Sequence, residues 1–472
     1  MKFNPSIFRE YDIRGIVDQE LTDAVAETLG KAYASFIRNR TPTAGRSRLT
    51  VSVGRDCRFS GEHYAEALTR GLLSYGINVV SLGVCPTPLT YFSIFNQDLD
   101  GGIMITGSHN PSNYNGFKIC VGKDTLHGHQ IQEMHSIMET LPPYSGEHGT
   151  ASSFDIIPAY LDYLLEHMPK LSKKKVVLDA GNGVAGNVAP PLFEKLGAEV
   201  IPLFCELDGN FPNHHPDPTV HSNLKDLVAT VIKEKADFGI AFDGDGDRIG
   251  VVDNSGKILF GDELMVIFSR DVLKSSPGAT IISEVKSSHR LYQDIAAKGG
   301  KPIMWKTGHS LIKSKMKESK AALAGEMSGH VFFADRYYGY DDAIYAAARF
   351  YEIATKAGGP TSTLLLDLPK MVATPEIRVD CEELKKFDLV RQTKVQLAKN
   401  HKINDIDGVR VEFGDSWGLV RASNTQPVLV LRFEAPTEAR LKEIRDIIET
   451  ELKTAAEAIH HAPIVIGRSD HP

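Results

Sequence analysis

Apolar runs alternate with amphipathic stretches and glycine-containing loops along most of the chain, and this order occurs three times. In the first occurrence, an apolar run at Leu49–Val53 precedes a loop, a helical pattern over Tyr64–Leu73 and a second run at Ile77–Leu82. The same order returns from Val176 to Ile201 and from Thr280 to Trp305. Short apolar runs predict buried strands, and apolar residues at helical spacing predict helices. The pattern therefore predicts three α/β units.

A glycine follows the helical pattern in each unit. These glycines are Gly76, Gly197 and Gly299, and each is followed within a few residues by the next apolar run. Glycine adopts the left-handed conformation that ends many helices at no steric cost. Because the units recur at domain-sized intervals, we expect three related α/β domains.

The last part of the chain has a different pattern. Strand patterns around 408–413, 419–421 and 428–433 precede a long amphipathic stretch. The apolar face of that stretch consists of Leu441, Ile444, Ile447, Ile448 and Leu452. We expect an α+β domain here, followed by a loosely attached tail over 460–472.

Proline- and glycine-rich segments separate these regions. They predict domains over 1–150, 151–255, 256–368 and 369–472, with a hinge near Pro369–Pro375 that lets the last domain move. The sequence of 472 residues has a net charge of −7, which gives no general attraction to nucleic acid. Its five cysteines form no C-x-x-C pair, as expected for a reducing compartment. No apolar run approaches the ~20 residues of a membrane span, and the N-terminus lacks a signal-peptide core, so we expect a cytoplasmic protein.

The clearest chemical signal is the loop Asp243–Arg248, with the sequence DGDGDR. It joins two apolar runs, so it predicts a tight turn between two strands. Two carboxylates ~5 Å apart repel by about 3 kcal/mol at an effective dielectric of about 20, so three of them in one turn favour a bound cation. Oxygen ligands from few residues suit Mg²⁺. A calcium-binding EF-hand loop is excluded because Arg248 and Asn254 replace its glycine and glutamate; an exposed acidic turn is the remaining alternative.

Ser108 lies in the segment TGSHNP, just after the apolar run Gly102–Ile105. A serine in such a loop is by itself more often a turn residue than a nucleophile, and the segment does not match the G-x-S-x-G motif of hydrolases. We expect the side chain of the adjacent His109 to diverge from Ser108, which makes it a poor base. With a cation bound nearby, however, Ser108 becomes a candidate to carry a phosphoryl group, which His109 and Lys118 would stabilise.

Two further loops carry polar side chains between predicted strands. Gly325–His330 has the sequence GEMSGH, and its carboxylate, hydroxyl and imidazole suit sugar hydroxyls. Arg421–Pro427 combines a guanidinium, hydroxyls and an amide, which suit a phosphate group. An ordinary loop is the alternative for each when it is considered alone.

Together the four motifs TGSHNP, DGDGDR, GEMSGH and RASNTQP, in this order, resemble those of the α-D-phosphohexomutase family, and most closely its bacterial phosphomannomutase/phosphoglucomutase branch. The resemblance extends from Phe8–Gly15 to the Arg421–Pro427 loop. It implies four domains around a central cleft: three related α/β domains with mixed sheets between helices, and a C-terminal α+β domain similar to the TATA-binding protein. Met327 stands where amino-sugar mutases of the family usually have glutamine, which favours mannose and glucose phosphates.

The resemblance also implies a role for each matched side chain. Ser108 resembles the phosphorylated serine, and Asp243, Asp245 and Asp247 resemble the residues that, with Ser108, hold one Mg²⁺ per chain. The side chains that resemble groups assisting phosphoryl and proton transfer are Arg14, His109, Lys118, Arg248 and His330. The side chains that resemble groups binding the sugar and its second phosphate are Tyr11, Lys286, His309, Glu326, Ser328, Arg421, Ser423, Asn424 and Thr425.

The expected activity is the interconversion of hexose 6-phosphate and hexose 1-phosphate, with mannose, glucose or both as the sugar. Phosphorylated Ser108 would form a hexose 1,6-bisphosphate, which serves as intermediate and activator and reorients in the cleft. A metal-dependent sugar phosphatase and a non-catalytic sugar-phosphate binding protein are the alternatives. We expect hexose phosphates as the partners, no nucleic acid or membrane, and a monomer, with an oligomer left open.

Overall fold

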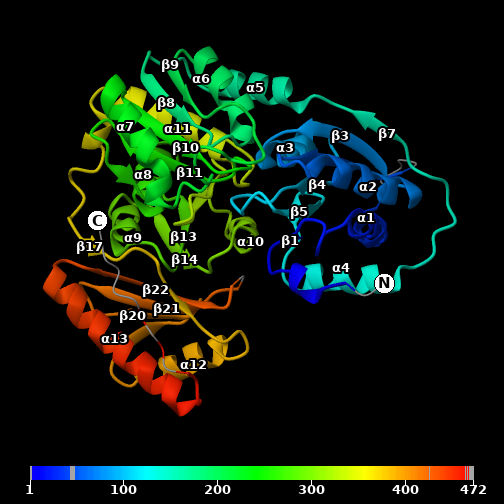
Figure 1. The fold of residues 1–472 in the computed structure, drawn as a ribbon. Coiled ribbons are helices and arrows are strands. Elements are labelled where there is room, and N and C mark those ends of the chain that lie inside the picture. Colours follow the sequence, from blue (N-terminus) through cyan, green and yellow to red (C-terminus); the bar gives the residue numbers. More distant parts are fainter. Residues whose placement is uncertain (1–2, 43–47, 425, 463, 465, 467–472) are drawn as a thin grey trace.

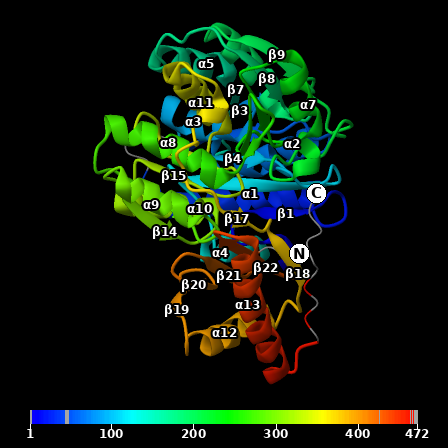
Figure 2. The same ribbon diagram turned by 90° about the vertical axis from the view of Figure 1, so that its left-hand side faces the viewer.

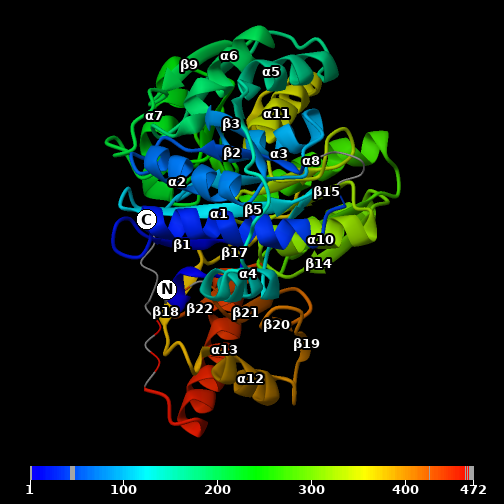
Figure 3. The ribbon, with the colours of Figure 1, turned by 90° about the vertical axis from the view of Figure 1, so that its right-hand side faces the viewer.

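The structure is a computed structural model, and it describes residues 3–42, 48–424, 426–462, 464 and 466. Figure 1 shows the chain passing from the first domain, in blue and cyan, through the green and yellow middle of the molecule to a separate orange and red lobe. This lobe, the last domain, lies at one end of the molecule in both rotated views (Figures 2 and 3). No helix in the described part of the chain is long and apolar enough to cross a membrane.

The first domain contains a mixed sheet with the strand order β1-β5-β4-β2-β3-β7, and β6 pairs with β5. Its strands are β1 (Ile13–Ile16), β2 (Thr50–Arg55), β3 (Asn78–Val84), β4 (Gly101–Ile105), β5 (Tyr114–Val121), β6 (Asp124–Thr125) and β7 (Ala151–Ser153). Its helices are α1 (Asp23–Arg38), α2 (Gly61–Ser74), α3 (Thr87–Asn96) and α4 (His129–Thr140). Strand β7 continues this sheet beyond residue 150, and the domain boundaries stay predictions.

The second and third domains have smaller sheets, with the orders β12-β11-β10-β8-β9 and β14-β13-β15-β16. The second contains α5 (Ile156–His167), β8 (Lys175–Asp179), α6 (Ala189–Lys195), β9 (Glu199–Leu203), α7 (Lys225–Glu234), β10 (Phe238–Phe242), β11 (Ile249–Asp253) and β12 (Ile258–Leu259). The third contains α8 (Gly261–Ser275), β13 (Thr280–Glu284), α9 (His289–Ala297), β14 (Lys301–Trp305), α10 (His309–Ser319), β15 (Leu323–Gly325), β16 (Val331–Phe333) and α11 (Ala343–Ala357).

These three sheets share one pattern of strand pairing. In each, two parallel pairs are followed by an antiparallel hairpin: β3-β2-β4-β5, β9-β8-β10-β11 and β14-β13-β15-β16. The predicted threefold repeat is therefore confirmed. Gly76, Gly197 and Gly299 have φ of 75°, 96° and 81°, as expected at helix ends.

The repeat places three of the polar loops at equivalent positions. The Ser108 loop joins β4 to β5, the Asp243–Arg248 loop joins β10 to β11, and the Gly325–His330 loop joins β15 to β16. Each is thus the turn of the antiparallel hairpin of its domain. A rigid sheet therefore holds both ends of every one of these loops.

The last domain is an antiparallel sheet with the order β17-β22-β21-β20-β19, and β18 also pairs with β22. It contains β17 (Val372–Ala373), β18 (Ile377–Asp380), α12 (Lys386–Leu397), β19 (Lys402–Asn404), β20 (Val409–Glu412), β21 (Trp417–Ala422), β22 (Val428–Ala435) and α13 (Glu438–Ala458). The apolar face of α13 is buried as predicted, with Ile447 partly so. An α+β domain and the predicted fold class are confirmed.

The prediction of a loosely attached tail is wrong for the residues that directly follow α13. The side chain of Ile464 is buried against the core of the last domain. The carbonyl of His460 accepts a hydrogen bond from Lys385 (3.2 Å), and Nε2 of His461 lies 3.3 Å from Sγ of Cys381. Burial of one more apolar side chain anchors this segment.

Candidate active site

Ser108 lies in the hairpin turn of the first domain with only 2% of its surface exposed. Its backbone is left-handed, with φ of 49°, and its N–H donates to Oγ1 of Thr106 (2.7 Å). Its hydroxyl donates to Oδ2 of Asp243 in the second domain (3.0 Å). The candidate nucleophile and the aspartate loop, which are 135 residues apart, are therefore in direct contact.

The expectation that His109 diverges from Ser108 is wrong. Nδ1 of His109 lies 3.2 Å from Oγ of Ser108. The left-handed backbone at Ser108 changes the direction of its side chain relative to an extended or helical turn, so that the two neighbours meet. Burial lowers the pKa of His109 well below its usual value, and Arg248 and Arg14 lower it further.

Asp56 and Arg58, which lie outside the four motifs, form a buried ion pair that holds the Ser108 loop. Arg58 donates to the backbone carbonyls of Ser108 (2.9 Å), Asn110 (2.6 Å), Pro111 (2.5 Å) and Tyr114 (2.9 Å). Its partner is Asp56, whose Oδ2 lies 3.1 Å from Nε of Arg58 and also accepts from the hydroxyl of Thr106 (2.8 Å) and the N–H of Gly107 (3.2 Å). Both charged side chains are 1% exposed, and together they fix the path of the loop.

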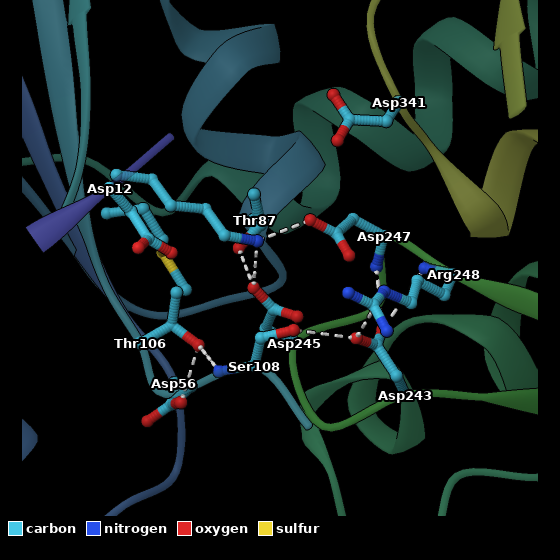
Figure 4. Close-up of polar contacts among 12 residues, drawn as sticks. Asp12, Asp56, Thr87, Thr106, Ser108, Asp243, Asp245, Asp247, Arg248 and Asp341 are labelled. Carbon is cyan, nitrogen blue, oxygen red and sulfur yellow. Dashed lines mark hydrogen bonds and ion pairs between the residues drawn. The ribbon is translucent and has the colours of Figure 1, made fainter. Parts of the chain in front are cut away.

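The aspartate loop brings three fully buried carboxylates together (Figure 4). Ligand oxygens of Asp243, Asp245 and Asp247 all lie within 4.8 Å of one another. Oδ1 of Asp245 and Oδ1 of Asp247 are buried without a hydrogen-bond partner among the described residues. Buried carboxylate oxygens need donors or a cation, so this set of oxygen ligands fits a hard divalent ion such as Mg²⁺.

Two side chains of the first domain hold the aspartates. Thr87 donates to Oδ2 of Asp245 (2.5 Å), and Nζ of Lys118 lies 2.7 Å from the same oxygen. Lys118 also contacts Oδ2 of Asp247. Both contacts cross from the first domain to the second and align Ser108 with the aspartate loop.

The buried charged groups at this end of the site shift one another's pKa values. Burial raises the pKa of Asp243 well above its usual range, and Asp245 and Asp247 raise it further. Burial alone would also raise the pKa of Asp245, but the Lys118 ammonium outweighs this effect and the pKa lies below its usual value. A cation bound among the three aspartates would favour their ionised forms.

The loops of the second and third domains are joined through Arg248. Nε of Arg248 donates to Nε2 of His330 (3.1 Å), and the two residues form an isolated antiparallel bridge. Because arginine can only donate, Nε2 of His330 is the unprotonated nitrogen. Its Nδ1 lies 3.2 Å from Oδ2 of Asp341 and 3.7 Å from Oδ1 of Asp247.

The sugar-recognition candidates Tyr11, His309 and Glu326 lie beside His330. The rings of His309 and His330 stack with their centroids 5.4 Å apart, and the ring of Tyr11 lies 5.8 Å from that of His309. One oxygen of Glu326 accepts from the N–H of Gly308 (2.7 Å), and burial raises the pKa of this carboxyl group. Ser328 is half-buried in the same hairpin turn as Glu326.

The predicted cations on the side of the last domain have carboxylate partners. Nζ of Lys286 lies 3.0 Å from Oε2 of Glu376, and Nη2 of Arg421 lies 3.2 Å from Oδ2 of Asp407. Nε of Arg421 is buried without a hydrogen-bond partner among the described residues. At the other side of the site, Arg14 donates to Oδ1 of Asn110 (2.7 Å), beside Ser108.

The phosphate loop predicted in the last domain touches the first domain. Nδ2 of Asn424 donates to the hydroxyl of Tyr11 (3.0 Å), which donates to the carbonyl of Thr307 in the third domain (2.9 Å). Ser423 is buried and accepts from the N–H of Gln426 (3.1 Å). Thr425 lies outside the described residues.

A continuous chain of contacts therefore links the predicted site residues of all four domains. It runs from Ser108 through Asp243, Arg248, His330 and Asp341 to His309, Tyr11 and Asn424. The candidate nucleophile, the aspartate set that could hold a cation, the candidate sugar-binding groups and the predicted phosphate loop are thus linked in one region of the molecule. This arrangement can move a phosphoryl group between a serine and a bound sugar.

Several residues of this site lie outside the four sequence motifs. Asp341 contacts His309, Lys313 and His330, and Asp407, Glu376 and Glu284 pair with the predicted cations. Asp56 and Arg58 had one usable signal: two opposite charges in the loop directly after a buried strand. The others are single carboxylates in ordinary surroundings, and only the three-dimensional structure distinguishes them.

Comparison with known proteins is consistent with this geometry. Family profiles match residues 5–142, 158–256 and 260–372 as phosphoglucomutase/phosphomannomutase α/β/α domains I, II and III, and 376–451 as the C-terminal domain. The chain belongs to the phosphoglucomutase/phosphomannomutase family. It is 48% identical to the phosphomannomutase/phosphoglucomutase of Pseudomonas aeruginosa strain PAO1 over 450 residues, which is 95% of this chain and 96% of the relative.

Other members of the phosphoglucomutase/phosphomannomutase family are also similar along their whole length. A phosphoglucomutase of Neisseria gonorrhoeae is 45% identical over 93% of this chain and 95% of its own. The crystal structure of a phosphoglucomutase/phosphomannomutase family protein from Burkholderia thailandensis superimposes with a TM-score of 0.89, at 41% identity, over 96% of this chain and 98% of its own.

Proposed function

We propose that the protein is a phosphohexomutase that interconverts hexose 6-phosphate and hexose 1-phosphate by way of phosphorylated Ser108. One observation carries this proposal: the hydroxyl of Ser108 lies 3.0 Å from Asp243, in an aspartate set with two buried oxygens that have no hydrogen-bond partner within the described parts of the chain. A serine nucleophile beside a cation site is suited to hold and release a phosphoryl group. Relatives named for both phosphomannomutase and phosphoglucomutase activity support mannose and glucose phosphates as substrates.

The metal that best fits this site is one Mg²⁺ held by Asp243, Asp245, Asp247 and the phosphorylated Ser108. When bound, it supplies charge neutralisation to the oxygens of the transferring phosphoryl group. Lys118 lies 2.7 Å from Asp245 and Arg248 lies 4.0 Å from Asp243, so both add positive charge to the same region. The negative charge of a phosphorylated Ser108 would therefore lie close to positive groups that are already in place.

The reaction proceeds in two mirrored transfers. In the first, the free hydroxyl oxygen of the hexose phosphate attacks the phosphorus, the bond from phosphorus to Oγ of Ser108 breaks, and a hexose 1,6-bisphosphate forms. The hydroxyl proton passes to a neutral histidine of the site, with His109 and His330 as the candidates, and the departing Oγ of Ser108 takes up a proton in turn. Arg14, Lys118 and Arg248 can only donate, so they stabilise the charge of the transferring phosphoryl group. After the bisphosphate has turned end for end, Oγ of Ser108 loses its proton and attacks the other phosphorus. The bond from this phosphorus to the sugar oxygen breaks, that oxygen takes up a proton, and the product leaves with Ser108 phosphorylated again.

The opposite end of the site holds the part of the substrate that does not react. We assign the second phosphate to Arg421, Ser423, Asn424 and Thr425, and the sugar hydroxyls to Tyr11, Lys286, His309, Glu326 and Ser328. Nε of Arg421 has no hydrogen-bond partner among the described residues, and the carboxylate of Glu326 is held through Oε1 by the N–H of Gly308. We further propose the finer features of the enzyme: a cytoplasmic location, activation by hexose 1,6-bisphosphate, a monomeric state and a hinge near Pro369–Pro375.

The decisive test compares the natural protein with Ser108→Ala. Mutase rates are measured on glucose 1-phosphate and mannose 1-phosphate with Mg²⁺ and a trace of bisphosphate, and inorganic phosphate is measured in parallel. We expect turnover of both sugars, no net phosphate release, and loss of activity by several orders of magnitude in the variant, because the nucleophile is gone. Full activity of the variant would contradict the role of Ser108. Net phosphate release would instead identify a phosphatase, and binding without turnover a sugar-phosphate binding protein.

A further inference from the structure

Glu284 is a fully buried carboxylate at the end of strand β13, and it has no role in the reaction described above. Its Oε2 accepts hydrogen bonds from the N–H of Lys286 (2.7 Å) and the hydroxyl of Thr307 (2.9 Å). Its Oε1 accepts from the N–H of Met327 (3.2 Å). One carboxylate thus holds three separate segments of the third domain.

Each of these segments carries a side chain that we assign to the sugar. The first ends in Lys286 itself, the second leads from Thr307 directly into His309, and the third lies between Glu326 and Ser328. The segments come from three different turns, after β13, after β14 and between β15 and β16. Glu284 is the group that fixes their spacing.

The segment at Thr307 also forms hydrogen bonds with two neighbouring domains. Its N–H donates to Asp407 of the last domain (3.0 Å), and its carbonyl accepts from Tyr11 of the first (2.9 Å). The next residue, Gly308, has φ of 133°, and a Cβ there would lie 2.5 Å from Cζ of Tyr11. Little free space remains around this turn, so a shift at Glu284 would be passed on to both neighbouring domains.

A carboxylate is the side chain that suits this position. It only accepts, and all three of its partners donate, whereas the amide of glutamine would place an N–H₂ group against at least one of these donors. Nζ of Lys286 lies 3.8 Å away, so the charge also faces a cation. The backbone carbonyl of Glu284 is held by the hydroxyl of Tyr292 (2.8 Å), which leaves the residue little freedom to adjust.

We propose that Glu284 is a positioning residue that sets the relative placement of Lys286, His309 and the Glu326–Ser328 turn, and through them the selection between sugars. It acts through these groups and does not touch the substrate. The proposal rests on the proposed function, since it presupposes that hexose phosphates bind at these three segments.

The test is the variant Glu284→Gln, which keeps the shape and changes the hydrogen bonding. We expect kcat/KM for both hexose 1-phosphates to fall on the order of 100-fold, because misplacement by about 1 Å costs this much, and the mannose-to-glucose ratio to change. The slow loss of phosphate from phosphorylated Ser108 to water, measured without sugar, should stay unchanged, because the Ser108 end of the site is intact. If Glu284 only stabilised the fold, kcat/KM and the rate of phosphate loss to water would change together.

Asp342→Asn is the matched control in the same domain. Asp342 is also a buried carboxylate that accepts from hydroxyls, those of Tyr160 (2.9 Å) and Tyr337 (2.8 Å), and from a backbone N–H, that of Tyr345 (2.8 Å). We expect this variant to lose stability without a change in the mannose-to-glucose ratio. Equal kinetic losses in both variants, or natural kinetics in Glu284→Gln, would overturn the proposal.

Thr307→Val provides the test if Glu284→Gln does not fold, because it removes one hydrogen bond to Glu284 and keeps a side chain of the same shape. A smaller fall in kcat/KM with a changed sugar ratio would support the proposal, and an unchanged ratio would overturn it. Absence of mutase activity in the natural protein would instead contradict the proposed function, so the two failures are distinguishable.

Discussion

The two ends of the site balance their charges in different ways. At the Ser108 end, the aspartates of one hairpin turn face Lys118 and Arg248, and two of their buried oxygens have no hydrogen-bond partner among the described residues. At the Arg421 end, each predicted cation already has a carboxylate of the last domain beside it, Lys286 with Glu376 and Arg421 with Asp407. The first end can therefore hold a ligand of positive charge, whereas at the second end a ligand of negative charge competes with carboxylates of the protein for the same cations.

This difference matches the tasks of the two ends. Phosphoryl transfer needs atoms held in place before the reaction, and Ser108 and the three aspartates are buried in hairpin turns of two sheets. Reorientation of an intermediate needs contacts that can be exchanged, and at the Arg421 end Lys286 meets Glu376 across the interface between the third and last domains, while Arg421 pairs with Asp407 within the last domain. A partner within the chain keeps Lys286 and Arg421 ordered while no substrate is bound.

The largest effect that tests this comparison is expected from Asp245→Asn. Loss of one carboxylate weakens the cation site, so kcat should fall by about 10²–10³-fold and a higher Mg²⁺ concentration should be needed. Asp253→Asn, at the far end of the neighbouring strand β11, is the control and should retain its activity. Both proteins are also assayed in the presence of a chelator. If Asp245→Asn is then as active as the natural protein without chelator, the aspartates do not bind a metal that the reaction needs.

A smaller effect is expected from Arg58→Lys, which keeps the charge but cannot reach the four carbonyls of the Ser108 loop together. We expect kcat to fall by about 10- to 100-fold with little change in KM, since the nucleophile is displaced and the sugar end is untouched. Steady-state kinetics on glucose 1-phosphate measure both constants. A change in KM alone would mean that the two ends of the site are not independent.

The smallest effect, and one of opposite sign, is expected from Glu376→Gln. Because Lys286 loses its partner within the chain, KM for hexose phosphates should fall by about fivefold, equivalent to about 1 kcal/mol. Lys286 lowers the pKa of Glu376 to about 2, and Glu376 and Glu284 outweigh burial and raise the pKa of Lys286. Both groups stay charged between pH 5 and 9 in the natural protein. In the variant, Lys286 loses a carboxylate that raises its pKa, so the two KM values should be compared near the lower end of this range. An increase in KM would show that Glu376 itself binds the substrate.

Local patterns predicted those features that depend on neighbours in the sequence. The glycine at the end of each repeated helix and the apolar face of α13 could be predicted because helices are built from contacts over a few residues. The hairpin position of the Asp243–Arg248 loop followed from the apolar runs on either side of it. The resemblance of the motifs supplied the roles of these loops.

Features that depend on distant segments could not be predicted in this way. The contact between Ser108 and His109 depends on a left-handed backbone that Arg58 stabilises from 50 residues away. The role of Glu284 depends on three turns that meet only in the folded domain. The anchoring of Ile464 depends on a sheet formed by earlier strands. In each case the identity of the residue alone does not predict its role, because the residue that it contacts lies far away in the sequence.

The central claim is that Ser108 passes a phosphoryl group to the sugar and takes one back. A single-turnover experiment tests it most directly: protein phosphorylated on Ser108 is mixed with an equal amount of glucose 1-phosphate and Mg²⁺, and intact mass and sugar phosphates are followed over time. We predict that the protein loses its phosphate as glucose 1,6-bisphosphate appears, and regains it as glucose 6-phosphate forms. Release of the phosphate as inorganic phosphate, or formation of glucose 6-phosphate while the protein stays unphosphorylated throughout, would contradict the account.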